Sequence, residues 1–118
     1  MSIRPLFAAV AVLALAGCAT DPAPIEQMRL TEQAITQAKA VGATADEVPE
    51  MKLAETKYTR ARGNMADQSY RNARMRAEQA ELDARLAEAK VLTQKSEEQL
   101  NVLNTRITRL RKQLGNAQ

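Results

Sequence analysis

Small and large apolar residues occupy two separate helical stripes in the second half of the chain. The first stripe has gaps that alternate between four and three and carries mainly alanine: Ala66, Tyr70, Ala73, Ala77, Ala80, Ala84, Ala87 and Val91. The second stripe has the same spacing, falls on the opposite side of the same helix and is richer in leucine: Leu82, Leu86, Ala89, Thr93, Ser96, Leu100, Leu103, Ile107, Leu110 and Leu114. A mean repeat of about 3.5 residues is typical of a helix face that stays turned toward a partner helix. Residues 66–114 contain neither glycine nor proline, so one continuous helix of about 70 Å is predicted there.

Two shorter helices are predicted before the long one. The first covers residues 25–41 and stops at Gly42, because glycine readily adopts the left-handed backbone that ends a helix. The second starts at Pro49, which fits the first turn of a helix, and runs to about residue 62. The pair Gly63-Asn64 is then expected to form the turn into the long helix.

The second and third helices are expected to form an antiparallel hairpin through a seam of small and large residues. The predicted hairpin core consists of Met51, Ala54, Tyr58, Ala61, Tyr70, Ala73, Ala77 and Ala80. In the expected register Ala61 lies beside Tyr70, Tyr58 beside Ala73, Ala54 beside Ala77 and Met51 beside Ala80, so that each larger side chain meets an alanine. The predicted fold class is therefore all-α, with three helices, an antiparallel αα-hairpin and a long C-terminal helix that extends as a coiled coil.

The end of the long helix carries large apolar residues that the hairpin does not reach in this register. The predicted partner-binding residues are Leu100, Leu103, Ile107, Leu110 and Leu114. Five such side chains left in water would promote aggregation, so a coiled coil with another chain is expected. In a parallel homodimer Arg106 would face Arg111, which disfavours that arrangement and leaves an antiparallel homodimer, a higher oligomer or an acidic partner helix. The alternative is that the first helix, or a bend in the long one, covers these residues.

The same segment is basic. No acid follows Glu98, while a basic tail follows: Arg106, Arg109, Arg111 and Lys112. One interpretation is attraction to anionic lipid headgroups or lipopolysaccharide. The other, which we favour, is that cations near the end of a helix offset its dipole.

The N-terminal segment has the pattern of an export signal. A cation at Arg4 precedes an apolar run over residues 6–16, which is too short to span a bilayer comfortably. The run ends in Leu-Ala-Gly-Cys at positions 15–18, which resembles the lipobox of bacterial lipoproteins. This resemblance implies cleavage between Gly17 and Cys18, followed by attachment of a diacylglycerol and an N-acyl chain such as palmitate to Cys18. An ordinary secretory signal with an incidental cysteine is the alternative.

The resemblance also implies where the protein goes. Bacterial lipoproteins retained in the inner membrane usually carry aspartate directly after the cysteine, whereas Ala19 follows here. The expected location is the periplasmic face of the outer membrane. The expected organisation is a signal peptide at 1–17, a lipidated cysteine and tether at 18–24, a helical hairpin domain at 25–92, and a coiled-coil extension and tail at 93–118.

A family resemblance covers roughly residues 25–95. The run at 77–90, AEQAELDARLAEAK, follows a helical hairpin and resembles a block in a family of short alanine-rich bacterial lipoproteins of uncharacterised function. Some members of that family are associated with, or fused to, OmpA-like domains that bind peptidoglycan. The resemblance therefore implies OmpA-like envelope proteins as candidate partners, and it supplies no catalytic residues.

The composition excludes much of the usual chemistry. The chain has no histidine and one cysteine, so the commonest general base and any cysteine cluster for a metal are missing. No catalytic or metal-binding residues are predicted, and no cofactor apart from the lipid on Cys18. Neither a nucleic acid nor a small-molecule substrate is expected. The predicted function is that of a structural or adaptor protein of the cell envelope. The alternatives are a periplasmic holdase chaperone and a binder of anionic membrane surfaces.

Overall fold

The computed structural model describes residues 21–117 and contains three α-helices. They are α2 (Ile25–Ala40), α3 (Pro49–Ala66) and α4 (Tyr70–Gly115). The all-α prediction, with a long C-terminal helix, is confirmed. The 46 residues of α4 give a helix about 70 Å long at the standard rise.

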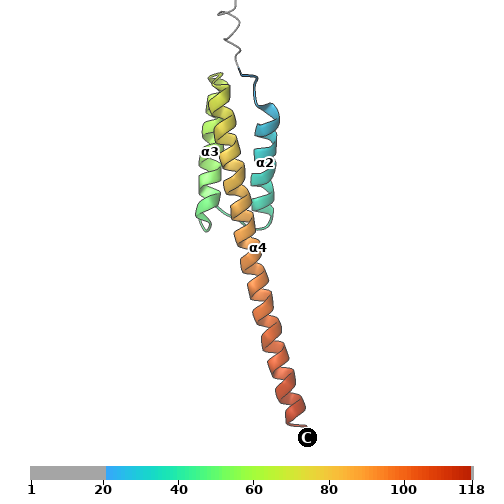
Figure 1. Ribbon diagram of the computed structural model, residues 1–118. Helices are drawn as coiled ribbons and strands as arrows, with labels where there is room; N and C mark the ends of the chain where they lie inside the picture. The colour runs from blue at the N-terminus through green and yellow to red at the C-terminus, as the bar shows by residue number, and fades with distance from the viewer. Residues whose placement is uncertain (1–20, 118) are drawn as a thin grey trace, which may run out of the picture.

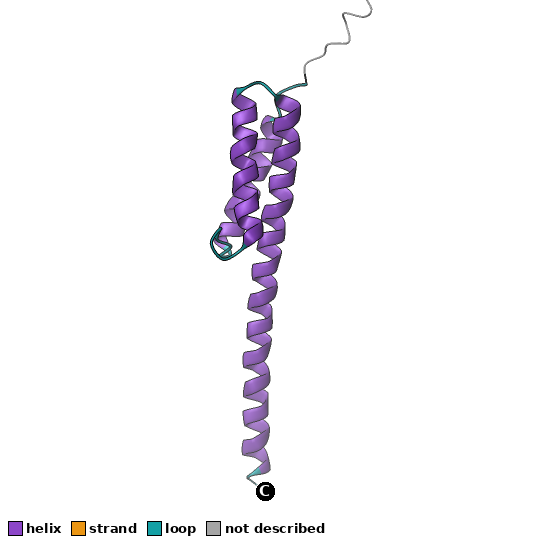
Figure 2. Cartoon of the chain, turned by 90° about the vertical axis from the view of Figure 1, so that its left-hand side faces the viewer, coloured by secondary structure: helices purple, strands orange, loops and turns teal. Residues whose placement is uncertain are grey.

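The first half of α4 is the element on which the other two helices pack (Figure 1). α3 runs antiparallel to α4, and α2 runs parallel to it on the other side, so the three helices form a short bundle (Figure 2). α2 and α3 pack chiefly on α4 and only slightly on each other. The second half of α4 extends beyond the bundle and makes the molecule elongated.

Alanine dominates the core of this bundle. The α4 residues that are completely buried have the predicted spacing of four and three: Ala73, Ala77, Ala80, Ala84 and Ala87. Among larger side chains, only Met51 and Thr31 are fully buried in the part of the chain that the structure describes. Because alanine has a single methyl group, the helix backbones approach closely, and contact between them replaces a thick apolar core.

The end of α2 follows the prediction. Gly42 adopts a left-handed φ of 99°. Its N–H donates to the Lys39 carbonyl at 2.9 Å, and the Ala43 N–H donates to the Ala38 carbonyl at 2.9 Å. These two bonds define a Schellman cap, in which glycine supplies the left-handed position at little steric cost. Ala43 is then completely buried against the bundle.

The turn between α3 and α4 was predicted at the wrong place. Gly63-Asn64 lies inside α3, which continues to Ala66, and α4 begins at Tyr70 rather than at residue 66. The left-handed residue is Gln68, with φ of 59°. The Gln68 N–H bonds to the Met65 carbonyl at 3.1 Å and the next N–H, of Ser69, bonds to the Asn64 carbonyl at 2.8 Å. The Schellman geometry at the end of α2 is thus repeated without a glycine, which a rule based on glycine cannot predict.

The predicted register of the hairpin is also wrong. Lys57 of α3 bonds to Asp83 of α4 at 2.6 Å, and Glu50 pairs with Lys90. Both pairs place the start of α3 several residues further along α4 than the expected pairing of Met51 with Ala80. One buried cluster accordingly joins four residues of the two helices: Met51, Ala54, Ala84 and Ala87. The register differs because the turn lies about four residues later than Gly63-Asn64, which moves every pairing along α4.

Polar contacts tie α2 to α4. The Thr31 hydroxyl, completely buried, lies 2.8 Å from the Gln27 carbonyl of its own helix and 2.9 Å from the Ala77 carbonyl of α4. The Gln27 amide donates to Glu81 at 2.7 Å. At the other end of α2, Lys95 Nζ donates to the Val41 carbonyl at 2.6 Å and so satisfies a free carbonyl at the negative end of that helix.

Candidate interaction surface

The second half of α4 leaves the bundle just after Val91. Val91 is partly buried, and every described residue after it is exposed. The five predicted partner-binding residues are 46–71% exposed: Leu100, Leu103, Ile107, Leu110 and Leu114. Within residues 21–117, neither α2 nor a bend in α4 covers them, so that alternative is wrong.

The exposed apolar face also continues back along the bundle. Leu82 and Leu86 are 68% and 47% exposed, and Met75 is 47% exposed. All three share the heptad positions of the distal leucines, on the side of α4 turned away from its buried alanines. We define the leucine face as these three residues together with the five distal ones. Met75 was missed in the sequence, although its place seven residues before Leu82 could have revealed it.

The four cations of the basic tail do not share one side of α4. With Leu100 and Ile107 at heptad position a, Arg106 falls at g and Arg111 at e, directly beside the leucine face on its two edges. Arg109 and Lys112 fall at c and f, on the far side. The ion pairs found among the described residues all lie within residues 26–90, in the bundle.

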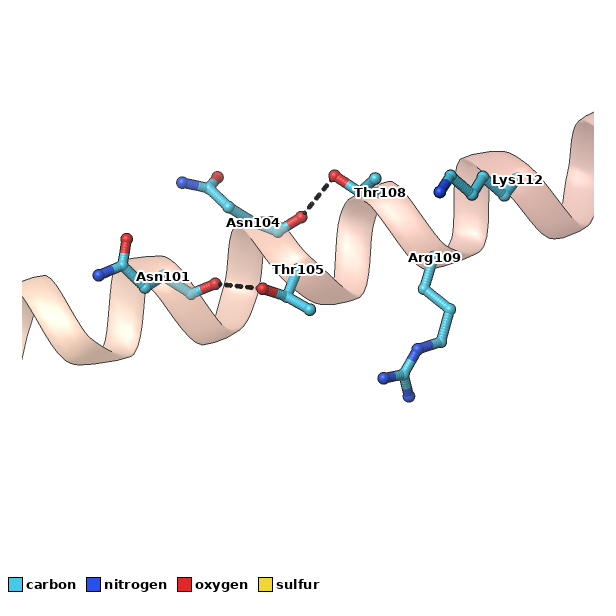
Figure 3. Close-up of a pocket in the computed structure, with 6 residues that line it drawn as sticks. All are labelled: Asn101, Asn104, Thr105, Thr108, Arg109 and Lys112. Atoms are coloured by element: carbon cyan, nitrogen blue, oxygen red, sulfur yellow. Dashed lines mark hydrogen bonds between the residues drawn. The ribbon is translucent and has the colours of Figure 1, made fainter.

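A shallow polar hollow runs along the same part of α4 (Figure 3). Its lining residues all belong to α4: Asn101, Asn104, Thr105, Thr108, Arg109 and Lys112. The two threonine hydroxyls donate back to the Asn101 and Asn104 carbonyls at 2.9 Å, as threonines in helices commonly do. With no second element opposite, the hollow cannot enclose a small ligand.

Carboxylates at the edges of the bundle are stabilised by hydrogen bonds. A hydrogen bond from Arg85, and then one from Gln27, lower the pKa of Glu81 below its usual value of 4.5. A hydrogen bond from Lys90 lowers the pKa of Glu50 in the same way. These groups hold α2 and α3 to α4. Each already has a cationic partner, so they have the character of structural ion pairs rather than of catalytic acids.

The two tyrosines of the predicted hairpin core are only partly buried. Tyr58 and Tyr70 remain at intermediate exposure, whereas the other six residues of that set are completely buried. Burial, and then the charge of Glu32, raise the pKa of the Tyr58 phenol. Tyr58 packs against the buried cluster, as a core residue would.

Asp21 and the tip of α4 lie at opposite ends of the molecule. Asp21 lies beside Gln68, Ser69 and Tyr70, at the turn between α3 and α4. The tip of α4 lies at the opposite end of the elongated molecule (Figure 1). Gly17 and Cys18, predicted as the cleavage and lipidation sites, lie outside the described residues.

None of the helices within residues 21–117 combines the length and the apolar character that crossing a membrane requires. No group of three or more carboxylate or cysteine side chains there is placed to hold a metal ion.

Comparison with known proteins identifies a family and a structural relative. Residues 26–103 match the family described as a domain of unknown function, DUF4398. The chain is similar to the crystal structure of a DUF4398 family protein, PA2901, from Pseudomonas aeruginosa, with 65% sequence identity and a TM-score of 0.79. The match covers 82% of this chain and 100% of that one. No curated protein matches. The expected likeness to an uncharacterised family is therefore confirmed.

Proposed function

This chain belongs to the DUF4398 family, and we propose that it is a lipid-anchored adaptor of the cell envelope that holds a partner helix on the leucine face of α4. The lipid is attached to Cys18, and the expected location is the periplasmic face of the outer membrane. The role is one of binding rather than catalysis. OmpA-like envelope proteins are candidate partners through the family resemblance.

The observation that carries the proposal is the exposure of the five distal leucine and isoleucine side chains, of which 46–71% is in contact with water. Burying one such side chain completely is worth about 1.5–3 kcal/mol. Since roughly half of each is exposed, the five together offer several kcal/mol to a partner. A partner would bind these exposed residues directly, without any rearrangement of the bundle.

The placement of the anchor supports the same role. The tether begins beside the turn between α3 and α4, and α4 extends from the other end of the bundle. A lipid on Cys18 would hold the bundle close to the membrane and direct the tip of α4 up to about 70 Å away from it. The exposed residues would then be offered to a partner at a distance from the bilayer, which favours an adaptor over a binder of the anchoring membrane.

The test is site-specific photo-crosslinking in living cells. A photoreactive side chain at Leu103 is compared with one at Thr105, which is two residues away on the opposite side of α4. The proposal expects one defined adduct from position 103, its loss when Ile107→Asp is added, and no such adduct from position 105. The same adducts from both positions, or none from position 103, would contradict it.

The lipid anchor is tested separately. Cys18→Ser removes the sulfur that would carry the diacylglycerol, so labelled palmitate supplied to the cells should be incorporated into the wild-type protein and not into the variant. Equal labelling of the two proteins, or no labelling of the wild type, would contradict lipid anchoring. That result would leave the crosslinking result unaffected.

A further inference from the structure

The charges beside the leucine face indicate what kind of helix it binds. We infer that the partner is an acidic amphipathic helix, rather than a second copy of this chain or an anionic membrane. This inference rests on the proposed function, because it assumes that the leucine face is a docking surface. It goes further by assigning the chemistry of the occupant.

Cations border the distal part of the leucine face on both edges. In a coiled coil the residues at e and g border the apolar seam and contact the corresponding residues of the partner. Arg106 borders the distal leucines on one side and Arg111 on the other. Within the bundle the same edge positions hold Arg85, Lys90 and Asp83, each of which already has an ion-pair partner in the chain. Beyond the bundle, the charged edge residues are Glu97, Arg106 and Arg111. A partner with glutamate or aspartate at both of its edges complements this pattern in either orientation.

A second copy of the chain complements this face poorly. No acid follows Glu98, while four cations follow it. Two copies joined over residues 100–114 would place four cations, Arg106 and Arg111 of each copy, at the edges of the interface, and no acid within these residues could pair with them. Like charges across an interface select against that partner. An acidic helix removes the repulsion and replaces it with attraction.

A membrane surface also complements this face poorly. Helices that lie in a membrane surface use a broad apolar face, rich in tryptophan, phenylalanine and leucine. The distal half of α4 has no aromatic residue, and five of its seven large apolar residues lie on the narrow a and d seam of a coiled coil, the other two being Leu92 at g and Val102 at c. Its four cations also stand on different sides, with Arg109 and Lys112 turned away from the leucine face. This arrangement suits a helix better than a flat anionic surface.

The experiment uses two designed probes. Both are synthetic helices of about four heptads with isoleucine at a and leucine at d, one with glutamate at e and g and the other with lysine there. Binding to residues 21–118 is measured by calorimetry at low salt. This segment contains all three helices, and the crystallised relative matches 82% of the chain with its whole length. The glutamate helix should bind at least about ten-fold more tightly than the lysine helix, and the difference should shrink as salt is raised.

Two double variants with the same change in net charge locate the effect. Arg106→Glu with Arg111→Glu alters both edges of the leucine face and should reverse the preference, so that the lysine helix binds more tightly. Arg109→Glu with Lys112→Glu alters the far side and should leave the preference unchanged. An equal effect of the two double variants would show attraction by net charge alone and would overturn the inference.

Other outcomes separate this inference from the proposed function. Leu103→Asp with Ile107→Asp should abolish binding of either probe, and continued binding would contradict the proposed docking surface itself. A different outcome is that the double substitution abolishes binding while the two probes bind the wild-type chain equally tightly. That result would support the leucine face as a docking surface and would contradict an acidic partner. Sedimentation as a dimer at micromolar concentration, or binding to phosphatidylglycerol vesicles that requires the leucine face, would also overturn the acidic partner.

Discussion

The two halves of α4 differ in what covers them: the bundle buries a seam of alanines on the first half, whereas the described residues of the second half are all exposed. In the first half alanines are completely buried, from Ala73 to Ala87. In the second half leucines and an isoleucine are exposed, with Leu114 at 71%. A soluble helix ordinarily buries its largest apolar residues and exposes its polar ones. The exposure of the large apolar residues in the second half shows that they do not contribute to the packing of the bundle.

The difference also shows how the bundle is stabilised. Buried alanines remove little apolar surface from water, so the bundle depends on close backbone contact and on polar ties at its edges. The hydroxyl of Thr31, the ion pair of Lys57 with Asp83 and the Lys95 bond to the end of α2 are such ties. Removing the leucines should therefore leave the bundle intact, while enlarging the alanines should break it.

The largest effect is expected from a leucine placed in the buried seam. Ala84 is completely buried among helix backbones, so Ala84→Leu should force the helices apart and lower the free energy of unfolding by about 1–3 kcal/mol or more. The matched control is Ala89→Leu, because Ala89 is exposed on the same helix. Urea unfolding should show no loss of unfolding free energy for Ala89→Leu. Equal losses of unfolding free energy for the two variants would contradict the close packing of the helices around Ala84.

A smaller loss of unfolding free energy is expected when the buried hydroxyl of Thr31 in α2 is removed. Thr31→Val keeps the shape but removes the hydrogen bond to the Ala77 carbonyl, which should cost about 1 kcal/mol of unfolding free energy. The control is Thr36→Val, an exposed threonine of the same helix with a bond only to its own turn. Thermal unfolding at matched protein concentration should give a lower midpoint for Thr31→Val than for Thr36→Val. A Thr31→Val protein as stable as the wild type would show that the hydrogen bond to the Ala77 carbonyl does not stabilise the bundle.

A gain in stability is expected from a substitution at Gln68, the left-handed residue of the α3–α4 turn. Gln68 has a positive φ, which is unfavourable for a residue with a side chain, so Gln68→Gly should raise the free energy of unfolding by about 0.5–1 kcal/mol. Gly63→Ala should add a similar amount, because Gly63 is exposed inside α3 and an added methyl group meets nothing within 4 Å. A loss of stability in Gln68→Gly, measured by urea unfolding, would contradict the turn geometry.

Acid should weaken the bundle by a modest amount. Glu50 and Glu81 have folded-state pKa values below 4.5, so the unfolded chain binds protons more readily than the folded one near that pH. Their contribution is complete above pH 4.5 and is lost as the pH falls through the lower folded-state values. The midpoint of urea unfolding should therefore decrease from pH 6 to pH 3. Glu50→Gln with Glu81→Gln should reduce this decrease, and an unchanged pH dependence would contradict the role of these pairs.

The smallest effect is expected in the second half of α4. Leu103→Ala should change the unfolding free energy of the dilute protein by less than about 0.5 kcal/mol, as expected for an exposed position. A buried leucine would cost about 2–5 kcal/mol. Urea unfolding distinguishes these values, and a loss in the larger range would mean that Leu103 is covered in the free protein.

Much of the fold could be predicted because periodicity and helix ends are local properties. The alanine seam over residues 73–87, the glycine stop at residue 42 and the start at Pro49 all follow from spacing or from backbone preference. The turn could not be placed, because a glycine inside α3 was taken for a terminator while Gln68 took the left-handed position. The register followed that error, since one turn position sets every pairing along the hairpin.

The candidate surface was predicted in part. The exposure of Leu100 and Ile107 follows from the lengths of the helices, because α2 and α3 are too short to reach them. The capping role of Lys95 could not be predicted, because its carbonyl partner at Val41 lies on another helix at a distance that depends on the register. The place of Met75 on this face could have been read from its spacing of seven residues before Leu82, whereas its exposure depends on which sides of α4 the other helices cover.

Hydrogen exchange along α4 is the most direct test of the leucine face. A helix without tertiary contacts is only marginally stable, so in dilute protein the amides of residues 100–114 should exchange at least about a hundred-fold faster than those of residues 77–87. Addition of the glutamate helix should slow exchange at residues 100–114 and leave residues 77–87 unchanged. Protection of residues 100–114 as strong as that of residues 77–87, in dilute protein without a partner, would contradict the account.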